Sequence, residues 1–216
     1  MKQALLKYLV DPADGTPLQY AARDNQLYNP TNDNRYPVEE DVPILLKAQA
    51  ATAVKSSLHH DRQQTEFHYV DHYQKDARAF DYFAPYSDGA TVHENRRLHE
   101  AIVGRIPKNA EVVLDVGSGG AWLARALQHR TQQVISFDIS AKNTKAALQK
   151  HPFSNHYAVT GDVYHLPFAT DSLDCIVTAE VIEHVPDPAA FLACLLRVLK
   201  PDGTLIVTTP HAEKIQ

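Results

Sequence analysis

Residues 112–122 read Val-Val-Leu-Asp-Val-Gly-Ser-Gly-Gly-Ala-Trp. A short apolar run ends in an acid, Asp115, and breaks into a glycine-rich turn, after which Leu123 and Leu127 stand one helical turn apart. A strand, a tight glycine turn and a helix open a doubly wound α/β sheet, whose ligands bind beyond the carboxyl ends of the strands. Glycine suits such a turn because a residue without Cβ lets the backbone turn sharply and approach a ligand closely.

The spacing of the glycines argues against a dinucleotide. A dinucleotide-binding loop that starts at Gly117 needs a third glycine at the position of Trp122. The stretch instead resembles the first motif of the class I S-adenosylmethionine-dependent methyltransferases, acid-x-G-x-G-x-G. Asp115, Gly117 and Gly119 match this motif, while Ala121 stands where the family usually has its third glycine.

A second apolar run, residues 134–138, also ends in an acid, Asp138. A carboxylate at the end of the second strand can accept hydrogen bonds from both ribose hydroxyls of a nucleoside, and it repels a 2′-phosphate. The alternative is that Asp138 is only a turn residue. Two apolar runs in succession that each end in an acid favour the interpretation that Asp138 binds a ligand. Ser140 is the predicted N-cap of a helix over residues 141–150.

The resemblance continues beyond the third strand, which we expect over residues 155–159. An acid followed by an apolar residue contacts the adenine in this family, and Asp162 and Val163 match those positions. After a fourth strand, residues 178–185 resemble the Glu-His-Val signature of the methyltransferases that act on quinones, lipids and natural products. The Asn-Pro-Pro-Tyr motif of amide and adenine methyltransferases is missing there.

These marks define an expected cofactor site. The resemblance implies S-adenosylmethionine as the cofactor, with Glu180 near its cationic methionine end or its sulfonium. His184 has two interpretations, a general base for a phenol or hydroxyl near pH 7 or a residue that hydrogen-bonds the loop backbone. No metal ligands are expected. The expected cofactor-binding residues are Asp115, Gly117, Ser118, Gly119, Asp138, Ile139, Asp162, Val163, Glu180 and Tyr73.

The composition limits the possible partners. The net charge is −5 and no block of lysine or arginine occurs, so no electrostatic footprint for nucleic acid is visible. We also expect no contact with a membrane, because no apolar run is long enough to span one and no signal peptide is present. Cys175 and Cys194 lie in apolar stretches and are typical of a reduced, cytoplasmic protein.

Residues 1–47 differ from the rest and predict a small β-rich domain. Short strand-like pieces alternate there with turn signals such as Asp-Pro-Ala-Asp-Gly at 11–15. The segment resembles a small zinc-ribbon-like family whose members activate transfer-RNA and release-factor methyltransferases as separate subunits. That family often carries Cys-Pro-x-Cys where this chain has Asp11 and Asp14, so we expect the fold without the metal.

The remaining chain divides into two parts. Residues 48–92 predict a helical, aromatic-rich connector that could cover the cofactor, with Tyr73 on one face. Residues 93–216 predict a Rossmann-like methyltransferase domain. It begins with a helix over 93–106, and a later helix over 189–199 is opened by Asp187 as N-cap and Pro188 at its first position. The expected core residues of that later helix are Leu192, Leu195, Leu196 and Leu199.

The family's sheet has seven strands, whereas this sequence ends just after the expected fifth strand, residues 204–209. Residues 205–208 would then form an open, apolar edge, so we expect a fragment of a longer protein or a homodimer that covers this edge. The expected activity is methyl transfer to a small-molecule acceptor. The alternatives are a transfer-RNA or protein methyltransferase with its activator domain in cis, and an S-adenosylmethionine-binding protein without catalysis.

Overall fold

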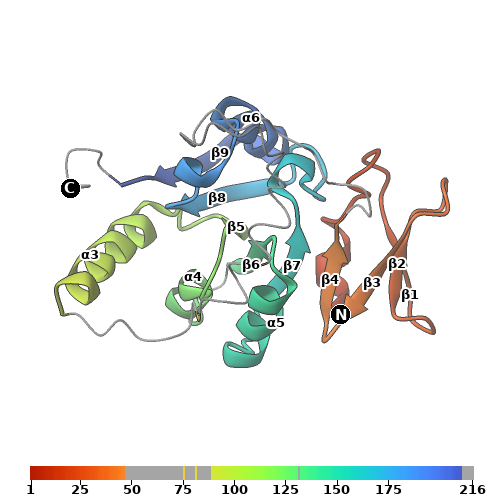
Figure 1. Cartoon of the computed structure of the whole chain (residues 1–216), viewed down its shortest axis with the longest axis horizontal. Coiled ribbons are helices and arrows are strands. Elements are labelled where there is room, and N and C mark those ends of the chain that lie inside the picture. Colours follow the sequence, from red (N-terminus) through yellow and green to blue (C-terminus); the bar gives the residue numbers. More distant parts are fainter. Residues whose placement is uncertain (47–74, 76–80, 82–88, 131, 211–216) are drawn as a thin grey trace, which may run out of the picture.

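The computed structural model describes residues 1–46, 75, 81, 89–130 and 132–210 (Figure 1). Within these residues one nine-stranded sheet runs through the molecule in the order β1-β2-β3-β4-β7-β6-β5-β8-β9. The strands of the larger part are parallel, as expected for a Rossmann-like α/β fold. Their bounds are β5 Val112–Val116, β6 Gln133–Asp138, β7 His156–Gly161, β8 Leu173–Ala179 and β9 Leu199–Thr208.

Helices cover both faces of the parallel strands (Figure 1). On one face, α3 and α4 place Ile102, Leu123 and Leu127 against Val113 and Val177 in one apolar cluster. On the other face, α6 packs against Leu114 and Ile176 in a second cluster. The helices and 3-10 turns of this part are α3 Gly89–Arg105, α4 Trp122–Ala126, α5 Ala141–Lys150, η1 Val163–His165, η2 Ile182–His184 and α6 Pro188–Val198.

Two of the predicted helix starts are confirmed at the level of single hydrogen bonds. The Ser140 hydroxyl accepts from the Asn143 N–H at the start of α5, and the Asp187 carboxylate accepts from the Ala190 N–H at the start of α6. Such caps each stabilise a helix by about 1 kcal/mol because they satisfy an N–H that has no partner within the helix. The Ser140 cap, two residues after the end of β6, also fixes where α5 begins.

Other expectations need correction. Leu196 does not belong to the core of α6, because its side chain is 58% exposed, and the buried stripe is Phe191, Leu195 and Val198. The helix expected over residues 93–106, α3, begins at Gly89. The last strand begins at Leu199, since residues 200–203 form an irregularity within β9 rather than a turn before it.

The first 46 residues form a small unit of one short helix and four strands. Strands β1 to β4 are antiparallel to one another, and the last of them, β4, pairs in parallel with β7. The unit therefore extends the large sheet at the β7 end, while β9 lies at the opposite edge (Figure 1). Its bounds are α1 Gln3–Leu6, β1 Gln19–Ala21, β2 Gln26–Tyr28, β3 Arg35–Glu39 and β4 Val42–Leu45.

Asparagine amides bind the carboxylates of Asp11 and Asp14, the two residues that the sequence comparison set against cysteines. The Asn29 amide donates to Asp11 at 2.8 Å and to Asp14 at 3.1 Å, and the Asn32 amide donates to Asp14 at 2.7 Å. Asn29-Pro-Thr-Asn32 repeats the spacing of Asp11-Pro-Ala-Asp14, a pairing that the sequence interpretation missed. The Tyr36 hydroxyl donates to Asp11 at 2.6 Å and the Asn34 amide donates to it at 2.9 Å, and we call these six residues the Asp–Asn cluster.

The hydrogen bonds of the Asp–Asn cluster set the charge state of its buried carboxylate. Burial by itself would raise the pKa of Asp11, but hydrogen bonds from Tyr36 and two asparagine amides outweigh it and lower the pKa to about 2. Asp11 is only 1% exposed, so it remains a buried anion held by neutral donors. Among the described residues, no group of three or more His, Cys, Asp or Glu side chains is placed to hold a metal ion.

We expect Asp11→Ala to lower the free energy of unfolding by about 2–3 kcal/mol near pH 7, because buried donors lose their acceptor. Since the folded-state pKa of Asp11 is lowered, this contribution is present above about pH 4 and is lost as the pH falls toward 2. Urea unfolding followed by circular dichroism at pH 7 and pH 3 measures both effects. Asp14→Ala, at an exposed carboxylate, is the control with the smaller loss. Equal midpoints for Asp11→Ala and the wild type would contradict this assignment.

Among the described residues, no helix has the length and apolar character needed to cross a membrane.

Candidate functional site

The glycine turn after β5 folds over the end of β6. The backbone N–H groups of Gly117 and Ser118 both donate to the carbonyl of Phe137, at 2.8 and 3.1 Å. Gly117 and Gly119 have positive φ angles of 71° and 43°, which glycine adopts without a steric penalty. Ala121 also has a positive φ, 53°, which explains why the resembling family prefers glycine at this position.

Asp138 ties this turn to the next helix. One carboxylate oxygen accepts from the Gly119 N–H at 3.1 Å, and the other accepts from the Ser140 N–H at 2.9 Å and from the Asn143 amide at 3.4 Å. Burial raises the pKa of Asp138, and these hydrogen bonds oppose the rise. The residue is 9% exposed, and a carboxylate offers about four acceptor sites. Acceptor capacity therefore remains for a ligand hydroxyl.

Buried polar atoms without partners collect around the turn. Within the described residues, three of the five buried side-chain atoms without a hydrogen-bond partner belong to Asp115, Ser118 and Thr178, and the other two belong to Gln132 and Gln133 at the amino end of β6. Burial, together with the nearby charge of Asp138, raises the pKa of Asp115 to about 8. Unsatisfied buried polar atoms are uncommon in folded proteins and mark places where a ligand or water completes the set. With a pKa of about 8, Asp115 is protonated near pH 7, so it can donate as well as accept a hydrogen bond.

The end of β8 meets the same turn. Thr178 pairs with Val116 across the two strands, and Glu180 follows directly after β8 with a positive φ of 55°. A Cβ atom on Gly117 would lie 2.5 Å from the Val181 side chain, so the two loops approach each other as closely as a glycine allows. The structure thus brings Asp115, the glycine turn and residues 180–181 together at the carboxyl ends of β5 and β8.

Asp162 and Val163 lie after β7, next to the end of β6 in the sheet. Asp162 is 2% exposed, and its carboxylate accepts from the Tyr164 N–H at 3.0 Å and contacts His165 Nδ1 at 3.1 Å. Val163 is buried. Both residues therefore stand at the sheet end where the resemblance placed adenine contacts, although Asp162 already has two local partners.

The remaining expected residues are less closely linked to the turn. Ile139 follows Asp138 and packs partly against the core. The His184 side chain is 57% exposed, with Nε2 at 3.9 Å from a Glu183 carboxylate oxygen. Tyr73 lies outside the described residues. Thr178 and its unpaired hydroxyl were not expected, because a threonine at the end of an apolar run gives no distinctive sequence signal.

An aromatic stack flanks the turn on its helical side. The rings of His99 on α3 and Trp122 on α4 lie parallel, with centroids 3.8 Å apart. Burial lowers the pKa of His99, and the charge of Arg125 lowers it further. Trp122 is the single tryptophan of the chain and directly follows Ala121. Its emission therefore reports on the region around the glycine turn.

We expect Trp122 fluorescence to stay constant from pH 8 to 6.5 and to fall at lower pH, because a protonated imidazole in contact with an indole quenches its emission. The lowered pKa of His99 sets the transition below the ordinary histidine value of 6.5. A fluorescence titration measures it, and His99→Gln should abolish most of the change. A His99→Gln profile that matches the wild type would show that another group causes the quenching.

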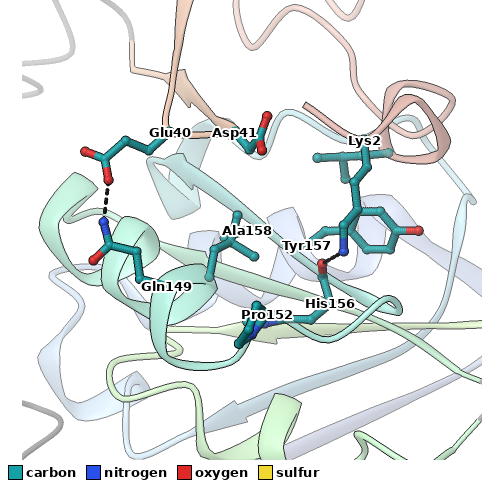
Figure 2. Close-up of a pocket in the computed structure, with 10 residues that line it drawn as sticks. Lys2, Glu40, Asp41, Gln149, Pro152, His156, Tyr157 and Ala158 are labelled. Carbon is teal, nitrogen blue, oxygen red and sulfur yellow. Dashed lines mark hydrogen bonds between the residues drawn. The ribbon is translucent and has the colours of Figure 1, made fainter.

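A separate cavity of about 220 Å³ lies between the amino-terminal unit and α5 and β7 (Figure 2). Lys2 stands at its edge, and its ammonium donates to the carbonyls of Phe153, Ser154 and His156. His156 is the first residue of β7, so this cavity lies at the amino end of the strand. It lies where the amino-terminal unit packs on the larger part, at the end of the sheet opposite to the glycine turn. The other lining residues are Leu5, Glu40, Asp41, Leu148, Gln149, Pro152, Tyr157 and Ala158.

The arrangement at the carboxyl ends of β5, β6 and β8 is that of a Rossmann-like nucleotide-binding fold. Residues 114–207 match a protein family described as a methyltransferase domain. Among curated proteins, a ubiquinone biosynthesis O-methyltransferase from Paracidovorax citrulli is 33% identical over 131 residues, which are 54% of this chain and 53% of that protein. The chain thus spans about half the length of this relative.

Solved structures agree on the fold. A chain of the complex between the Haloferax volcanii Trm112 methyltransferase activator and a candidate methyltransferase is 25% identical, with a TM-score of 0.51 over 65% of this chain and 59% of that one. Phosphoethanolamine N-methyltransferase 1 of Haemonchus contortus, in complex with phosphoethanolamine and S-adenosylhomocysteine, gives 0.56 at 19% identity over 67% of this chain and 33% of that one. Residues 114–207 thus match a methyltransferase domain, and these solved structures share the fold of the chain.

Proposed function

We propose that this chain binds S-adenosylmethionine beyond the carboxyl ends of β5, β6 and β8 and transfers its methyl group to a small-molecule acceptor. The observation that carries this proposal is the set of buried polar atoms without described partners around the glycine turn, on Asp115, Ser118 and Thr178. These atoms, together with the remaining acceptor capacity of Asp138, can bind the polar groups of the cofactor.

The proposed binding roles are those that the sequence resemblance implies. Asp138 would accept hydrogen bonds from the ribose hydroxyls. The backbone of Gly117 to Gly119 would lie directly against the cofactor. Asp162 and Val163 would contact the adenine, with Ile139 beside the ribose. Glu180 would face the cationic methionine end. Tyr73 remains a proposed contact from the connector.

The chemistry requires little covalent help from the protein. When bound, S-adenosylmethionine supplies an electrophilic methyl group on a cationic sulfur. The protein contributes by holding the acceptor atom in line with that methyl group, which replaces an encounter in solution with a fixed geometry. A hydroxyl acceptor must also lose a proton, and His184 beside Glu183 is the proposed base. The names of the curated relatives make a phenolic hydroxyl the first acceptor to test.

A second candidate is a macromolecular methyltransferase with its activator in cis. The amino-terminal unit supports it, because Val10 N–H donates to the Pro167 carbonyl and the Tyr8 carbonyl accepts from the Ala169 N–H. The unit thereby holds the loop after Asp162 as well as β7. The solved complex that includes a methyltransferase activator is consistent with such a pairing. A third candidate is binding of the cofactor without catalysis.

Formation of S-adenosylhomocysteine separates these candidates. Turnover with a phenol or another small molecule supports the main proposal, and turnover only with transfer RNA or a protein supports the second. Tight binding of S-adenosylhomocysteine without turnover on any acceptor supports the third. A chain that binds neither S-adenosylmethionine nor its product would overturn all three.

We expect calorimetry to show binding of S-adenosylhomocysteine and no binding of NAD. Asp138→Asn should weaken the binding by about 1–3 kcal/mol, because a charged acceptor is lost. Asp174→Asn is a matched control, since Asp174 accepts from the N–H groups of Glu111 and Val112 at the amino ends of the strands. Equal affinity for wild type and Asp138→Asn would remove Asp138 from the site.

A further inference from the structure

Glu180 is held in a conformation that side-chain-bearing residues seldom adopt. Its φ of 55° lies in the left-handed region, and it directly follows the last residue of β8. Backbone strain of this kind costs on the order of 1–3 kcal/mol and persists only where surrounding contacts fix it. Its neighbour Val181 packs against the glycine turn, so the strained residue stands at the mouth of the proposed cofactor site.

One residue of the neighbouring strand makes both of the contacts that fix Glu180. The Glu180 N–H donates to the carbonyl of Thr208 at 3.1 Å, and the Thr208 hydroxyl donates to Glu180 Oε1 at 2.8 Å. Thr208 is the last residue of β9, which lies beside β8 in the sheet (Figure 1). Because a carboxylate only accepts hydrogen bonds, the direction of the side-chain bond is unambiguous.

The geometry of this pair leaves half of the carboxylate for a ligand. Thr208 binds Oε1, and within the described residues no hydrogen bond or ion pair is made by Oε2. The hydroxyl therefore orients the carboxylate plane without neutralising its charge. A charged acceptor held in one orientation binds a cation better than one that must be ordered during binding.

We propose that Thr208 is a positioning residue that orients the Glu180 carboxylate for the α-ammonium group of S-adenosylmethionine. This inference rests on the proposed function. It assigns to the last residue of β9 a role in cofactor affinity, although Thr208 itself need not touch the cofactor. Strand β9, at the edge of the sheet, thereby contributes to the site through the Thr208 hydroxyl.

A neighbouring pair supplies a matched control. The Thr209 hydroxyl donates to Glu183 Oε2 at 3.2 Å, also between the end of β9 and the loop after β8. This bond is longer and exposed, and Glu183 is not among the proposed cofactor contacts. A general effect of loosening the end of β9 should therefore appear equally in Thr208→Val and Thr209→Val. An effect through Glu180 should appear only in Thr208→Val.

The test is calorimetric affinity for S-adenosylhomocysteine, which retains the amino-acid end. Thr208→Val should weaken binding about tenfold, the scale of one hydrogen bond to a charged group. Thr208→Ser, which keeps the hydroxyl, and Thr209→Val should both stay within about twofold of the wild type. Glu180→Gln should lose affinity too, and Thr208→Val added to it should cause no further loss, because both changes act on one interaction.

Thr208→Val binding as tightly as the wild type would overturn the inference, and so would independent, multiplying losses in the double variant. Equal losses in Thr208→Val and Thr209→Val would overturn it as well. A wild-type chain that does not bind S-adenosylhomocysteine would instead contradict the proposed function. Thermal unfolding followed by circular dichroism verifies that each variant is folded, and the Thr208→Ser comparison keeps the test decisive if valine destabilises the strand.

Discussion

The proposed site depends on one hydrogen bond, which the Gly119 N–H donates to the Asp138 carboxylate. Through it the end of β6 holds the turn after β5, and the second carboxylate oxygen holds the start of α5 through the Ser140 N–H. The Phe137 carbonyl adds two bonds from the same turn. Three elements are thus fixed at one end of the sheet, around acids that have little exposure to solvent. A site fixed in this way can bind a ligand with little further ordering of the protein.

The amino-terminal unit contacts the same end of the sheet at β7. Its strand β4 pairs with the last residues of β7, Ile44 with Thr160 and Leu45 with Gly161. Leu9 also forms a bridge with Phe168 in the loop beyond η1. The unit itself is held by the Asp–Asn cluster, in which neutral amides donate to the carboxylates of Asp11 and Asp14. The cavity of Figure 2 is at the other end of this junction.

Much of the fold could be predicted because its signals are local. The acids that end β5 and β6, and the caps Ser140 and Asp187, each lie within a few residues of the element that they define. Leu196 was placed wrongly because helical periodicity alone cannot distinguish the centre of an apolar face from its margin. The Thr208–Glu180 bond joins residues distant in sequence, so no local pattern reveals it. The Asn29–Asp11 bond is also distant in sequence, and its one signal was the repeated spacing of Asp11-Pro-Ala-Asp14 in Asn29-Pro-Thr-Asn32. The ligand contacts of Glu180 and Asp162 stay predictions, because they depend on the position of a bound cofactor.

The position of the bound cofactor tests the account most directly. A crystal structure of the chain with S-adenosylhomocysteine should place the ribose at Asp138 and the amino-acid end between the glycine turn and Glu180. It should leave the cavity beside Lys2 and Tyr157 without cofactor. Electron density for the nucleoside in that cavity, or at any place away from the carboxyl ends of β5, β6 and β8, would contradict the account.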